Sequence, residues 1–327
     1  MDRVLRVILI FGWILDCFPV SNICHPIGQL RFKWLSLSVF YTIFVAILGL
    51  LLQLDVISGF ETNNISPNGT NSKAFRITMT SWQIIEVLHP LIVRIVGLFH
   101  CASVVKSIKG ICEIQDLTSQ FTSSKYAKLG RWRRRYNFWQ AVAFLCLLLV
   151  TVGQIRSYVM FFFRMLLAAT WKGQLGTYYE ALLPPWKPLI LVVSVCAIHN
   201  GSATVLMSLW LTLGFGLMLT KAHGEFSSCV HICLRNPTEF SDKEKDMTVL
   251  IFEHFKRLKR AFVVCGEVMG LYMLVTLGWI LCCTVYSVFS LIWPLDGITG
   301  FVELAHVLLS LVFLVIMGHF IQNQVGF

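Results

Sequence analysis

The chain has 327 residues, of which 56% are hydrophobic and only 13% are charged, and its formal net charge is +10. The charged share is about half of that found in soluble globular domains, which excludes a water-soluble fold. The positive charge does not indicate binding to nucleic acid, because the basic residues fall between long apolar runs, where membrane topology accounts for them.

The first apolar run covers residues 4–20 and is interrupted by Arg6 and Asp16. It is short for a membrane span. We predict an interfacial helix that leaves the N-terminus in the cytoplasm, with an extra span and an external N-terminus as the alternative. A cleaved signal peptide is disfavoured, because it would place both glycosylation sequons described below on the inside.

Six longer apolar blocks follow, close to the length that an α-helix needs to cross about 30 Å of hydrocarbon. They are uninterrupted and lack the alternation of barrel strands, which predicts helices. The predicted fold is therefore all-α, a polytopic transmembrane helical bundle that forms one domain over residues 1–327. The predicted spans are approximately residues 35–52, 77–105, 138–153, 188–219, 261–292 and 301–321.

The orientation follows from the distribution of Lys and Arg. With the loop at residues 55–76 outside, the cytoplasmic segments carry 20 basic residues and the external ones carry 6. This is a strong positive-inside signal, and it makes residues 221–260 a cytoplasmic segment. The external loop also carries two glycosylation sequons, at Asn64 and Asn68. None of the 11 cysteines lies in a predicted external loop, so no external disulfide is expected.

The second block contains four ionisable residues on one helical face about 140° wide, namely Glu86, His89, Arg94 and His100. Because ionisable groups are costly in hydrocarbon, this stripe is expected to face the bundle interior or a water-filled cavity. It predicts either the lining of a ligand pocket or a buried polar cluster that fixes helix packing.

Two further polar groups lie near the predicted external side. Glu303 and His306 open the last block at helical spacing, just after Asp296, and they suggest either ligand contacts or ordinary polarity at a helix end. The fourth block carries His199 and Asn200 between two serines, which indicates hydrogen bonds between helices or ligand contacts.

Enzyme signatures are missing: the sequence has no G-x-S-x-G, H-E-x-x-H, P-loop or dinucleotide fingerprint. Cys229-Val-His-Ile-Cys233 matches no standard zinc spacing. We therefore expect no enzyme, no cofactor and no bound metal. The remaining classes are a channel-type chemoreceptor, a seven-span G-protein-coupled receptor and a small-solute transporter. The Asp-Arg-Tyr and Asn-Pro-x-x-Tyr motifs of rhodopsin-like receptors are missing, which disfavours the second class.

The layout resembles the arthropod (insect and crustacean) gustatory receptor family. The resemblance rests on the aromatic stretch Gly12-Trp-Ile-Leu-Asp-Cys-Phe-Pro-Val20 and on Phe252-Glu-His-Phe-Lys-Arg-Leu-Lys-Arg260, which runs directly into the apolar residues 261–286. It implies a seven-span chemoreceptor with an internal N-terminus in the plasma membrane of a sensory neuron. It further implies a homo- or hetero-tetrameric cation channel, surrounded by membrane lipids and opened by a small-molecule tastant.

The family's strongest signature is Thr-Tyr followed five residues later by Gln-Phe in the seventh span, which lines the pore. The sequence reaches Phe327 before such a segment, so the resemblance implies a chain without its seventh span. It also implies a ligand pocket in the external half of each subunit. By depth and polarity the predicted pocket residues are Glu86, His89, Gln154, Tyr158, His199, Asn200, Tyr286, Glu303 and His306.

Overall fold

The computed structural model describes residues 2–15, 17–23, 25, 29–62, 73–122, 141–156, 159, 200–235, 244–292 and 297–325. Throughout these residues the regular elements are helices, and a single antiparallel bridge joins Ser21 to Arg31. The all-α prediction is therefore confirmed for the described chain. The helices are α1 (Asp2–Ile14), α2 (Leu37–Thr62), α3 (Lys73–Thr122), an unlabelled helix Ala141–Arg156, α7 (Asn200–Arg235), α8 (Glu244–Ile292) and α9 (Gly297–Val325).

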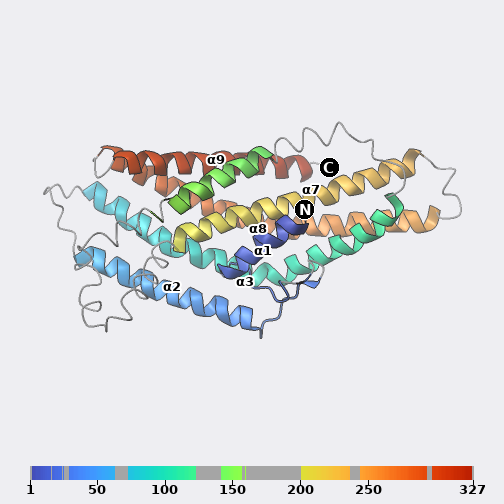
Figure 1. The fold of residues 1–327 in the computed structure, drawn as a ribbon, viewed down its shortest axis with the longest axis horizontal. Helices are drawn as coiled ribbons and strands as arrows, with labels where there is room; N and C mark the ends of the chain where they lie inside the picture. Colours follow the sequence, from blue (N-terminus) through green and yellow to red (C-terminus); the bar gives the residue numbers. More distant parts are fainter. Residues whose placement is uncertain are drawn as a thin grey trace.

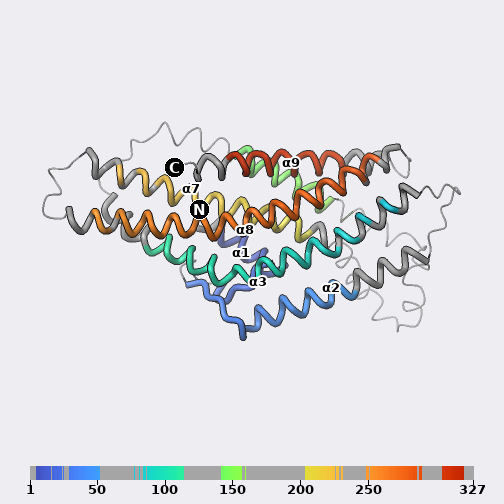
Figure 2. The backbone as a smooth tube through the Cα atoms, turned by 180° about the vertical axis from the view of Figure 1, so that it is seen from behind, coloured from blue at the N-terminus to red at the C-terminus, as the bar shows by residue number. Residues whose placement is uncertain are grey.

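The long helices lie side by side along the long axis of the molecule (Figures 1 and 2). α2 flanks α3 on one side of the bundle, and Ala141–Arg156 runs next to α9 on the other. One end of the bundle collects the start of α3, α7 and α9 and the end of α2 and α8 (Figure 1). The opposite end collects the end of α3 and α7 and the start of α8. The two predicted sides of the membrane thus correspond to opposite ends of one bundle.

Three described stretches are long and apolar enough to cross a membrane: Val87–Glu113, Ala203–Gly224 and Ile251–Val285. Shorter apolar helical stretches occur at Leu5–Ile14, Leu37–Leu51, Ala141–Arg156 and Leu304–His319. By length and composition, the structure supports a membrane protein with three helices able to span. The remaining predicted spans stay predictions.

Several helices continue past the predicted spans into segments that the sequence assigns to loops. α3 has 50 residues, or about 75 Å at 1.5 Å per residue, more than twice the thickness of the hydrocarbon layer. Residues 55–62 belong to α2, 73–76 to α3, and most of 221–260 to α7 and α8. Polar residues with good helix propensity extend a helix beyond its apolar part. The assignment of residues 55–76 to the outside and of 221–260 to the cytoplasm stays a prediction.

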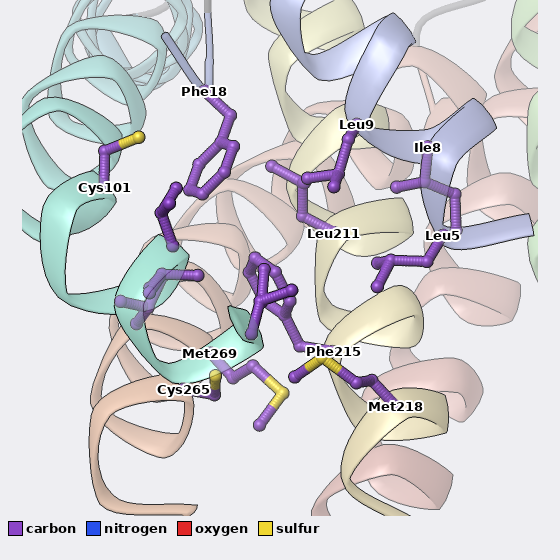
Figure 3. Close-up of a cluster of buried hydrophobic side chains, with 14 of the residues drawn as sticks. Leu5, Ile8, Leu9, Phe18, Cys101, Leu211, Phe215, Met218, Cys265 and Met269 are labelled. Carbon is purple, nitrogen blue, oxygen red and sulfur yellow. The ribbon is translucent and has the colours of Figure 1, made fainter. Parts of the chain in front are cut away.

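The short helix α1 packs into the bundle. Its 13 residues rise about 20 Å, less than the hydrocarbon thickness. Leu5, Ile8 and Leu9 are buried and face Leu211 and other side chains of α7, as Figure 3 shows. The outward side chains of α1, including Val7 and Phe11, are exposed. α1 therefore has one face built for the protein core and one apolar face left outside it.

The irregular chain after α1 is buried, and side chains of neighbouring helices satisfy its backbone. Cys17, Phe18 and Val20 are almost completely buried. Ser38 donates to the carbonyl of Val20 at 3.0 Å, Tyr41 donates to that of Ile14 at 3.0 Å, and the Cys101 thiol donates to that of Pro19 at 3.5 Å. Non-helical backbone at membrane depth is tolerated where protein surrounds it and pairs its polar groups, and this segment meets both conditions.

The buried side chains of α1 belong to one apolar cluster, and a second cluster joins Ala141–Arg156 and α9 to α7 and α8. It contains Leu147 of Ala141–Arg156, Val205 of α7, Trp279 of α8 and Val307 of α9, with Ile85 of α3 packed against it. These residues belong to five helices, several of which carry predicted pocket residues. The cluster therefore fixes how those helices meet.

Candidate functional site

His89 is the best-defined candidate residue. It lies on α3, is 1% exposed, and shares a hydrogen bond of 3.4 Å between its Nδ1 and the Oγ1 of Thr204 on α7. Its other ring nitrogen, Nε2, has no partner among the described residues. A buried polar atom without a hydrogen bond is costly, which makes Nε2 a position where a polar ligand group would be stabilised.

Pro90 follows His89 directly and is also buried. Proline has no N–H, so α3 loses the helical hydrogen bond that residue 90 would give to the carbonyl of Glu86. Such interruptions of spanning helices are tolerated where neighbouring groups can satisfy the freed carbonyl. The backbone at Glu86 thus adds a hydrogen-bond acceptor one turn from His89.

The other ionisable residues of the predicted stripe on α3 differ in burial. Arg94 is 5% exposed. His100 is half-buried. Glu86 lies in α3, but its side chain is outside the described residues. Two members of the stripe, His89 and Arg94, are therefore inside the bundle.

Gln154 and His306 lie at a second place, where Ala141–Arg156 meets α9. The imidazole of His306 lies directly against the backbone of Gly153, so that any side chain at residue 153 would overlap the ring. Gln154 is the next residue and is half-buried. The structure thus brings His306 beside the turn that carries Gln154, two residues that are far apart in the sequence.

Thr151 connects this second place to α7. The indole N–H of Trp210 donates to Thr151 Oγ1 at 3.1 Å, and the Thr151 hydroxyl donates to the carbonyl of Leu147 at 2.7 Å. Trp210 also packs edge-on against Phe144, with ring centroids 5.6 Å apart. The helix Ala141–Arg156 is therefore held to both α7 and α9 near Gln154.

The remaining predicted site residues are not placed in detail. Asn200 begins α7, Tyr286 lies near the end of α8 and Glu303 lies near the start of α9, each without a described side chain. Tyr158, His199 and the two sequon residues Asn64 and Asn68 lie outside the described residues. By helix position, Asn200, Tyr286 and Glu303 all belong to the end of the bundle where α3 begins (Figure 1).

Sequence reasoning missed Thr204, the partner of His89. Thr204, Ser208 and Thr212 follow one another at intervals of four along α7, and all three are buried. That spacing places them on one helix face, and it is the signal that could have found them. The hydroxyl groups of Ser208 and Thr276 form a hydrogen bond, with their oxygens 2.9 Å apart. Because Thr276 lies on α8, this bond links α7 to α8.

We expect Thr276→Val to lower the stability of the protein by about 0.6–1.7 kcal/mol, the range for hydrogen bonds between membrane helices. Ser208 would lose its partner on α8 while the shape of the residue is kept. The measurement is the change in unfolding free energy in detergent. Thr220→Val is the matched control, because the hydrogen bond that the structure describes for its hydroxyl stays within its own helix, to the carbonyl of Gly216. An equal effect of both substitutions would contradict the interhelical role.

No protein-family model matches the chain, and no curated protein sequence matches it either. Within the described residues, no group of three or more His, Cys, Asp or Glu side chains is arranged to hold a metal ion. The groups that the structure describes at the candidate site, the His89 ring and the Thr204 hydroxyl, form a hydrogen bond with each other.

Proposed function

We propose that the chain is a chemosensory receptor of the gustatory type, a subunit of a ligand-gated cation channel that detects a small-molecule tastant. In this proposal it lies in the plasma membrane of a sensory neuron with six spans and a cytoplasmic N-terminus. In this proposal receptor subunits assemble as a tetramer around a cation pore. The apolar helices, the basic segments gathered on one side and the lack of enzyme motifs support this class of function.

The observation that carries the proposal is the unsatisfied Nε2 of buried His89. Ionisable residues within spanning helices are rare and mark pathways or binding sites. A histidine that served only to hold helices together would be expected to use both ring nitrogens. His89 uses Nδ1 toward Thr204 and leaves Nε2 for a ligand.

In this proposal the ligand is small, polar and able to form a hydrogen bond with Nε2 of His89. The sequence also puts Glu86 and Glu303 among the predicted pocket residues, and in this proposal their carboxylates accept hydrogen bonds from ligand hydroxyl or amine groups. Val205, which follows Thr204 in α7, belongs to the apolar cluster with Val307, and in this proposal that cluster forms the hydrophobic wall of the site. This combination of apolar lining and few polar groups is typical of small-molecule sites.

We expect His89→Ala to weaken ligand binding roughly three- to tenfold, the loss of one hydrogen bond. The measurement uses the full chain, purified in detergent, with sucrose, fructose, caffeine and quinine as probes. At least one probe should raise the thermal unfolding midpoint of the wild type in a saturable way. Glu86→Ala and Glu303→Ala should weaken the same response.

The control is Val315→Ala, because the side chain of Val315 is exposed on α9 whereas that of His89 is buried. It should leave the apparent affinity unchanged. If His89→Ala, Glu86→Ala and Glu303→Ala all bind the active probe as the wild type does, the proposed pocket is wrong. If none of the four probes shifts the unfolding midpoint of the wild type, the proposal that the chain binds tastants of these kinds is wrong.

A further inference from the structure

One face of α8 is exposed along most of the helix. α8 is the least buried of the three helices able to cross a membrane. Its exposed residues include a series at alternating intervals of four and three, a spacing that keeps side chains on one helix face and along which helices pair. We call this series the α8 seam; it consists of Glu267, Leu271, Leu274, Gly278, Leu281, Val285 and Val288.

Lipid accounts for the apolar members of the α8 seam, since lipid tails are as apolar as leucine. It does not account for Glu267. This carboxyl group is exposed and makes no hydrogen bond or ion pair with any described residue. Glu267 stands seven residues after Arg260, or about 10 Å deeper along the helix axis. With Arg260 at the head groups, Glu267 lies in hydrocarbon, where acidic side chains normally face a partner.

The shape of the α8 seam also favours a helix as its neighbour. A Cβ added at Gly278, or at Gly270 beside the seam, would meet nothing within 4 Å. Glycines on the outside of a spanning helix let a second backbone approach closely. The seam therefore combines an open glycine, Gly278, with an acid, Glu267, that has no partner among the residues the structure describes.

The charge of Glu267 decides between possible neighbours. If two copies of this chain paired seam to seam, the two Glu267 carboxylates would meet at the same depth and repel each other. A helix with a basic side chain at that depth would supply the opposite charge. We propose that the α8 seam is the docking surface for a membrane-spanning helix of another protein, one that carries a lysine or arginine at the depth of Glu267.

The inference rests on α8 crossing the membrane, and its test needs no tastant, so it can fail independently of the proposed pocket. The full chain is labelled with a donor fluorophore and reconstituted in phosphatidylcholine vesicles. The probe is a synthetic Leu–Ala transmembrane helix with a single lysine at the depth of Glu267, and its control has leucine instead. We expect energy transfer to report about tenfold tighter association of the lysine helix.

Two substitutions separate the contributions of charge and shape. Glu267→Gln should abolish the preference for the lysine helix, while Gly278→Leu should weaken association of both helices. Both residues are exposed, so the fold should persist, which gel filtration of the purified variants checks. Val315→Leu on the exposed face of α9 is the matched control and should change nothing.

Equal association of the lysine and leucine helices with the wild type would overturn the proposal and assign the α8 seam to lipid. Energy transfer between two labelled copies of the chain, lost in Gly278→Leu and unaccompanied by a preference for lysine, would overturn it in favour of self-association. If Glu267→Gln still bound the lysine helix more tightly than the leucine helix, a group other than Glu267 would recognise the lysine. That result would also overturn the proposal.

Discussion

Substitution of Gly97 by alanine is expected to destabilise the protein by about 2–3 kcal/mol, the cost of overpacking a well-filled core. Gly97 lies on α3 where the backbone carbonyl of Cys17 touches the helix, and an added Cβ would overlap that carbonyl oxygen. The carbonyl cannot move cheaply. It belongs to a buried segment that is fixed by the bonds from Ser38 to Val20 and from Cys101 to Pro19.

The measurement is the unfolding free energy of purified Gly97→Ala in detergent, compared with that of Gly270→Ala. Gly270 lies on the exposed face of α8 with nothing within 4 Å of an added Cβ. Alanine there should be neutral or stabilising, by up to about 1 kcal/mol, because it is the better helix former. Equal effects of the two substitutions would show that the segment around Cys17 does not pack on α3 as described.

Gly153→Ala is expected to disrupt the contact between Ala141–Arg156 and α9. Any side chain at residue 153 would overlap the imidazole of His306, so either the ring leaves its position or the two helices separate. Overpacking of this kind costs about 1–3 kcal/mol. Because Gln154 is the next residue, the same change should alter binding of any ligand that uses Gln154 and His306. The unfolding free energy and the apparent affinity for an active probe are both measured.

The double variant Gly153→Ala with His306→Ala tests directly whether overlap with the imidazole causes the loss of stability. Removing the ring frees the space that the new methyl group needs, so the double variant should recover much of the stability lost in Gly153→Ala. The coupling between the two changes is expected to lie within about 0.5–3 kcal/mol, as for residues in direct contact. Strictly additive effects would contradict the contact between Gly153 and His306.

The positions of the helices could be predicted from the sequence, whereas their ends could not. Apolar blocks indicate the part of a helix that lipid or protein must cover, and each predicted block overlaps a described helix. The block at residues 77–105 stops where Lys106 begins a more polar stretch, yet α3 continues to Thr122. Hydropathy marks where the predicted surroundings of the helix change from lipid to water. The backbone hydrogen bonds of the helix continue past that point.

Part of the candidate site could also be predicted. His89 stands out because an ionisable residue within an apolar block is costly in lipid and is therefore expected to face the bundle interior. The structure places it there. Its partner Thr204 and the contact of Gly153 with His306 were not predicted. Both depend on which helices are neighbours and how they are rotated, and the periodicity of a single sequence does not contain that information.

N-glycosylation tests most directly whether this is a polytopic membrane protein whose segment between α2 and α3 lies outside. The chain is translated with microsomes, and glycosidase-sensitive mass shifts are compared for three forms: the wild type, the triple variant Asn64→Gln with Asn68→Gln and Asn200→Gln, and that triple variant with Glu239→Asn. The third form carries a new sequon, because Phe240 and Ser241 follow residue 239. The account predicts glycosylation of the wild type alone. An unmodified wild type together with a glycosylated residue 239 would contradict it and invert the protein in the membrane.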